Sequence, residues 1–156
     1  MKRLTLPEWA ELAEIIGTVA IVASLLFVAY EINRNTLVLQ GTGENEIYDS
    51  YQPIPLMIMQ DADTARIVKM GGENPADLNE IELFRYARYL EINLDLWERA
   101  FARFGEDLIS HSAWVGWDNF FVYWARQNLT DRSWAELRSG YDGDFVSYVD
   151  RRLSDD

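Results

Sequence analysis

Sixteen consecutive residues decide the fold of this chain: Ile15-Ile-Gly-Thr-Val-Ala-Ile-Val-Ala-Ser-Leu-Leu-Phe-Val-Ala-Tyr30. The run lies between Glu14 and Glu31 and contains no charged side chain. A helix that crosses a bilayer needs about 20 mostly apolar residues to cover roughly 30 Å of hydrocarbon. Residues 12–32 meet this length at about 1.5 Å per residue. The sequence therefore predicts one transmembrane helix near the N-terminus, with the lipid bilayer as a partner.

Two other interpretations of the run fit the sequence less well. A core helix of a soluble protein is usually shorter or carries a polar face. A cleaved signal peptide has a basic n-region and a cleavage site between small residues. Here Glu8, Glu11 and Glu14 precede the run, and no small-x-small site follows it. We expect a membrane anchor.

Small residues recur along one side of the predicted anchor, at Ala13, Gly17, Ala20 and Ser24. Helices in lipid associate largely through close backbone approach over such residues. The stripe predicts packing against another membrane helix, from a second copy or from another membrane protein. The alternative is that alanine and glycine are common in any membrane helix. The opposite face is bulky: Ile15, Val19, Val22 and Leu26.

Composition limits the remaining function classes. The chain has 26 acidic and 14 basic residues, a formal net charge of −12. Such a surface repels nucleic-acid phosphates, and no cluster of Lys and Arg is present, so no nucleic-acid partner is expected. The absence of cysteine excludes disulfides, thiolate zinc sites, iron–sulfur clusters and cysteine nucleophiles.

Helical periodicity continues after the anchor, and no segment alternates like a strand, so the fold class is expected to be all-α. Residues 1–40 form the anchor and its extension, and residues 41–76 a linker with one short helix at about 56–70. Residues 77–156 form an acidic, aromatic-rich helical domain. The Gly41–Gly43 segment is expected to interrupt the first helix, and Pro53 with Pro55 to impose an extended or kinked stretch.

The domain itself is expected to contain a long helix and three shorter ones. Asp77 with Glu80 resembles a capping box that opens the long helix, and Gly105 ends or interrupts it. An aromatic helix follows at 110–128, then a short helix with a capping box at Ser133, then a last helix at 145–153. The long helix carries a stripe with steps of three and four: Ile81, Phe84, Ala87, Leu90, Leu94, Trp97, Phe101, Phe104 and Leu108.

The aromatic helix carries more large rings than one helix face needs. Most of them are expected to form the domain core. The excess leaves open a second interpretation, in which part of the set faces a partner or the membrane interface. The residues considered for that surface are Trp114, Trp117, Phe121 and Trp124.

No constellation of residues indicates catalysis. His111 is the only histidine, so the paired Glu-x-x-His motifs of di-metal carboxylate bundles are missing. Glu91, Asp95 and Glu98 place three carboxylates on one helix flank, but arginines alternate with them as on a solvated charged face. We expect no enzyme activity, no catalytic or metal-ligating residue and no cofactor.

Four segments resemble a widespread group of uncharacterised bacterial proteins with one membrane helix and a small helical domain. The segments are residues 22–36, residues 63–67 with the glycines after them, residues 82–117, and residues 145–150. The resemblance implies a single-pass protein of the bacterial inner membrane and adds no activity. Members of the group usually leave the membrane with Gln and more basic residues, where this chain has Glu31.

The sequence does not decide on which side of the membrane the helical domain lies. Lys2 and Arg3 precede the anchor and only Arg34 follows closely, which weakly favours an N-terminus inside. In the group that this chain resembles, the Gln and basic residues that usually follow the membrane helix instead suggest a cytoplasmic domain.

These observations lead to one expected function and two alternatives. The first is a non-catalytic membrane protein that acts in assembly, as a homo-oligomer or as an accessory subunit of a larger membrane complex. One alternative is a carboxylate-based metal-binding or hydrolytic enzyme using Glu91, Asp95, Glu98 and His111. The other is an oligomeric ligand-binding or small-channel protein with Ser24 and Glu31 lining the pore.

Overall fold

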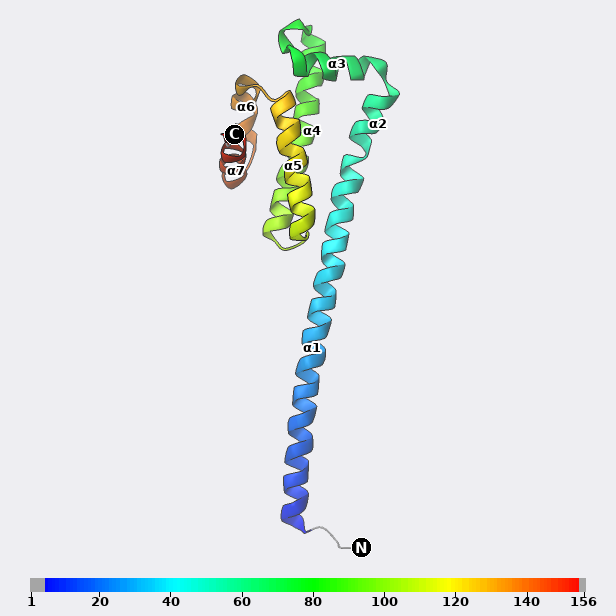
Figure 1. Cartoon of the computed structure of the whole chain (residues 1–156), viewed down its shortest axis with the longest axis vertical. Coiled ribbons are helices and arrows are strands. Elements are labelled where there is room, and N and C mark those ends of the chain that lie inside the picture. The colour runs from blue at the N-terminus through cyan, green and yellow to red at the C-terminus, as the bar shows by residue number, and fades with distance from the viewer. Residues whose placement is uncertain (1–4, 155–156) are drawn as a thin grey trace. The chain divides into compact units, whose positions relative to one another are not determined.

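The computed structural model describes residues 5–154, and every regular element in that range is helical (Figure 1). This confirms the all-α prediction. Lys2 and Arg3, on which the expected orientation partly depends, lie outside the described residues. The helices are α1 (Leu6–Tyr51), α2 (Pro53–Gln60), α3 (Ala62–Glu73), η1 (Pro75–Asp77), α4 (Glu80–Gly105), α5 (His111–Asn128), α6 (Asp131–Leu137), η2 (Arg138–Gly140) and α7 (Gly143–Ser154).

The chain divides into two compact units, with the boundary between Leu39 and Gln40. The described part of the first unit is the N-terminal part of α1. It contains the uncharged run, and the helix is long and apolar enough to cross a membrane. None of its most apolar window is buried by protein. The second unit contains the rest of the chain and the buried core.

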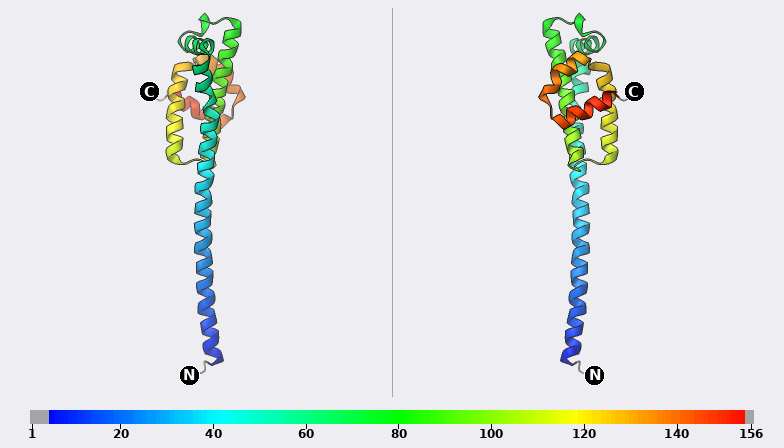
Figure 2. Two further views of the ribbon diagram at one scale, coloured as in Figure 1. Left: turned by 90° about the vertical axis from the view of Figure 1, so that its right-hand side faces the viewer. Right: turned by 90° about the vertical axis from the view of Figure 1, so that its left-hand side faces the viewer.

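Helix α4 is the centre of the second unit, and α5 lies along it in the opposite direction (Figure 2). Its buried side chains include Leu90, Leu94 and Trp97, as the periodicity predicted. The first two residues of the predicted stripe, Ile81 and Phe84, are exposed and not buried. The guanidinium of Arg88 lies over the Phe84 ring, 5.4 Å from its centroid.

The segment 41–76 is part of this unit and is not a separate linker. Ile47, Ile54 and Ile67 from α1, α2 and α3 are all buried in the same core as α4. Helix α1 continues without a break through Gly41 and Gly43. A Cβ atom on Gly43 would lie 2.2 Å from the carbonyl oxygen of Leu108. This glycine therefore permits close approach of α1 to the α4–α5 connection and does not end the helix.

An extended or kinked stretch was predicted at the prolines; the helical path breaks there between Tyr51 and Pro53, and Pro53 begins a new helix. Pro53 occupies the first turn of α2, where its missing N–H group is not needed. The helix expected at 56–70 is divided in two at Asp61. The Asp61 carboxylate accepts hydrogen bonds from the backbone N–H groups of Asp63 and Thr64, which caps α3.

The helix-capping residues differ slightly from those predicted. Asn79 caps α4, accepting from the Glu82 N–H at 3.0 Å, while the Glu82 carboxylate accepts from the Asn79 N–H. The capping box is therefore two residues further along the chain than Asp77 with Glu80. Thr130, three residues before Ser133, caps α6. Ser110 caps α5, which runs to Asn128 as predicted.

Candidate functional site

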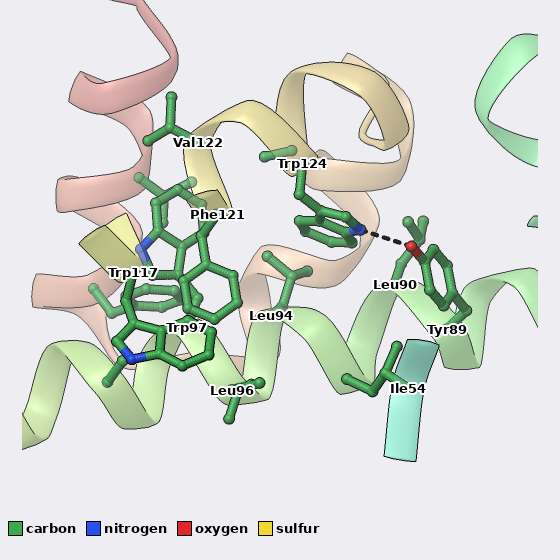
Figure 3. Close-up of a cluster of buried hydrophobic side chains, with 14 of the residues drawn as sticks. Ile54, Tyr89, Leu90, Leu94, Leu96, Trp97, Trp117, Phe121, Val122 and Trp124 are labelled. Atoms are coloured by element: carbon green, nitrogen blue, oxygen red, sulfur yellow. Dashed lines mark hydrogen bonds between the residues drawn. The ribbon is translucent and has the colours of Figure 1, made fainter. Parts of the chain in front are cut away.

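The aromatic side chains considered as a partner surface lie inside the second unit, and Figure 3 shows three of them, Trp117, Phe121 and Trp124. Trp114, Trp117, Phe121 and Trp124 have exposed fractions of 6%, 7%, 0% and 6%. They are therefore not available as a surface, and the core interpretation holds. The physical reason is that α5 is covered on several sides, by α4, by α3 and by α7, so it needs a broad apolar face.

Ring packing fixes these side chains relative to α4. The Trp97 ring stacks on Phe121 with centroids 5.8 Å apart, and the Trp117 ring also stacks on Phe121, at 5.7 Å. Further along, Trp124 Nε1 donates a hydrogen bond to the Tyr89 hydroxyl at 2.9 Å (Figure 3). Such contacts add specific geometry to apolar burial. This cluster is structural.

One charged pair is built into the same core. Asp118, on α5, is buried and accepts from Arg152 Nε at 2.9 Å and from Trp97 Nε1 at 3.3 Å. A buried carboxylate needs such partners, because an unpaired one is costly in a low dielectric. Burial raises the pKa of Tyr148, and the neighbouring Asp118 carboxylate acts in the same direction. The pair connects α5 to α7.

The carboxylates of the α4 flank lie in different environments. Glu91 forms an ion pair with Arg88. Glu98 accepts a hydrogen bond from the Asp142 backbone N–H at 2.8 Å. Both side chains therefore take part in contacts within the unit, and they are half-buried where a solvated charged face was expected. Asp95 lies beside Tyr141, whose pKa is raised chiefly by burial and secondarily by the Asp95 charge.

Asp95 and Glu98 also line an open, acidic hollow of about 730 Å³ between α4 and α7. Asp142 and Asp144 contribute from the start of α7, and Arg99 contributes the one cationic side chain of its lining. The apolar lining comes from Phe101, Ala102 and Phe145, and Glu106 adds a further carboxylate. The fold thus collects carboxylates from two segments far apart in sequence, which periodicity along α4 alone does not predict.

The hollow has no recognisable metal-ligand set. Within residues 5–154 no group of three or more His, Cys, Asp and Glu side chains is arranged to hold a metal ion. Tyr141, beside the hollow, places its hydroxyl 3.5 Å from the carbonyl oxygen of Glu91. Tyr141 thus contacts α4 next to the open hollow.

His111 and its serine neighbours lie at the start of α5. The Ser110 hydroxyl donates to the Glu44 carboxylate at 2.6 Å and accepts from the Ala113 N–H at 3.2 Å. The His111 ring packs near Phe104, with centroids 5.9 Å apart. Ser110 therefore acts as a helix cap that also connects α5 to the end of α1.

The small-residue stripe of the anchor is open in this structure. A Cβ atom on Gly17 would meet nothing within 4 Å. The Ser24 hydroxyl donates to the carbonyl oxygen of Ala20 within its own helix, at 2.8 Å. Ser24 therefore satisfies its hydrogen-bonding need without a second helix. Association through Ala13, Gly17, Ala20 and Ser24 stays a prediction.

A second hollow, of about 390 Å³, lies between α4 and α6. Its lining includes Leu83, Ala87 and Leu90 of α4 and Leu137 of α6. Arg132 and Glu136, which also line it, form an exposed ion pair with an N–O distance of 2.9 Å. This mainly apolar hollow was not predicted from the sequence, since the residues that line it come from three separate segments.

Comparison with protein families, with characterised proteins and with solved structures found no match to this chain. The functional argument therefore rests on the residues themselves. Sequence reasoning missed the buried pair of Asp118 and Arg152. A signal was present, because Asp118 is a lone carboxylate between Trp117 and Phe121 on an otherwise apolar face.

Proposed function

We propose that this chain is a non-catalytic, single-pass protein of the bacterial inner membrane. The protein would act in assembly, as a homo-oligomer or as an accessory subunit of a larger membrane complex. The observation that carries the proposal is the uncharged run 15–30, which is helical and exposed along its whole length.

The free energy of this exposure supports a lipid environment. Ten large apolar or aromatic side chains of the run are at least half exposed: Ile15, Ile16, Val19, Ile21, Val22, Leu25, Leu26, Phe27, Val28 and Tyr30. Removing one such aliphatic side chain from water is favourable by about 1.5–3 kcal/mol. Because these side chains are half to two-thirds exposed, their sum is comparable with the whole stability of a typical domain, about 5–15 kcal/mol. A bilayer removes this cost, and the helical backbone satisfies its own hydrogen bonds there.

The assembly role is supported by the contrast between the two units. Two of the candidate carboxylates of the helical unit are engaged within it: Glu91 pairs with Arg88 of its own helix, and Glu98 accepts from the Asp142 backbone N–H and so joins α4 to the start of α7. The anchor instead has an open stripe of small residues, the kind of surface over which membrane helices approach closely. Assembly through the anchor is therefore the function that this arrangement favours.

Membrane insertion is tested by placing two arginines in the run, with Val22→Arg combined with Leu25→Arg. Each central arginine disfavours insertion by about 2.5–3.5 kcal/mol. In a bacterial host, the wild-type chain should remain in membranes washed with alkaline carbonate, and the double variant should move largely to the supernatant. Phe84→Arg, at an exposed site in the helical unit, is the control and should stay in the pellet. Release of the wild-type chain by carbonate would refute the anchor.

Assembly is tested by measuring the mass of the full chain in a mild detergent. The wild-type chain should form an oligomer or carry a co-purifying membrane protein. Ala20→Leu, which fills the small-residue stripe, should reduce that complex several-fold. Val22→Leu on the opposite face is the matched control and should leave it intact. A wild-type chain that is monomeric and free of partners would contradict the proposal, even if the anchor holds in the membrane.

A further inference from the structure

We draw no further inference here: the strongest candidate, the acidic hollow between α4 and α7 lined by Asp95, Glu98, Asp142 and Asp144, is a cluster of carboxylates with no second observation in the described part of the chain that points to a ligand.

Discussion

Gly71 is a residue of α3 that packs directly against α4. A Cβ atom there would lie 2.4 Å from Cδ2 of Tyr86 and 2.6 Å from Cγ. The ring has little room to move, because Tyr86 is buried and its hydroxyl donates to the Asn128 carbonyl at 2.8 Å. Forcing extra volume into such a core typically costs 1–3 kcal/mol. We expect Gly71→Ala to lower the free energy of unfolding by about 2 kcal/mol, measured by denaturant titration of the full chain in detergent.

Gly116 provides the matched control for this substitution. It lies within α5, is exposed, and a Cβ atom there would meet nothing within 4 Å. Alanine is the better helix former by about 1 kcal/mol. Gly116→Ala should therefore raise the free energy of unfolding while Gly71→Ala lowers it. If both substitutions stabilise the protein, Gly71 is not packed tightly against Tyr86, and the assigned contact between α3 and α4 is refuted.

For single residues, the sequence indicated that these glycines have a structural role but not which role. The short helix was expected to end at about residue 70, before Gly71 and Gly72, whereas α3 runs through both residues to Glu73. A glycine that allows a turn and a glycine that allows close packing look the same in one sequence. Only the position of Tyr86, fifteen residues away, distinguishes them.

At the scale of elements, the start of α4 depends on Asn79. Its side chain accepts from the Glu82 N–H, and removing such a cap costs about 1 kcal/mol. We expect Asn79→Ala to lower the free energy of unfolding by about that amount. Asp77→Ala, at the position that the sequence pattern favoured, should change it by less than about 0.5 kcal/mol, as at ordinary surface sites. Equal losses in the two variants, measured by thermal unfolding, would reject the assigned cap.

Helix periods predicted the elements better than their ends. The long helix and the aromatic helix both appear where the three- and four-residue spacing indicated. The observed ends of these helices differ from the predicted ends. Several polar residues near the start of each helix can act as its N-cap, and the backbone geometry selects one of them. The continuation of α1 to Tyr51 was missed because Gly41 and Gly43 are poor helix formers. Packing of Ile47 into the core outweighs that local preference.

For the whole molecule, the boundary of the helical unit is the main correction. It begins at Gln40, so the domain predicted for residues 77–156 lacks three buried isoleucines, Ile47, Ile54 and Ile67. Their burial contributes about 1.5–3 kcal/mol each, which together is comparable with the stability of a small domain. We expect residues 40–156 to unfold cooperatively on heating and residues 77–156 not to.

Circular dichroism and differential scanning calorimetry distinguish these outcomes. Both fragments omit the anchor, so neither requires detergent. The fragment 40–156 serves as the control for helix content and for the enthalpy of unfolding. A cooperative transition of residues 77–156 at the same midpoint would show that the segment 41–76 is a linker after all.

The ring stack of Trp97, Phe121 and Trp117 also has an optical consequence. Trp97, Trp114, Trp117, Trp124 and Trp134 are all buried in the helical unit, whereas Trp9 is exposed on the anchor. Indole emission shifts to shorter wavelength when the ring leaves water, so the folded unit emits mainly in the blue part of the tryptophan band. The rigid, asymmetric setting of these rings also gives the unit a strong near-ultraviolet dichroic signal. The helical unit therefore contains its own spectroscopic reporter, and no added dye is needed to follow its folding.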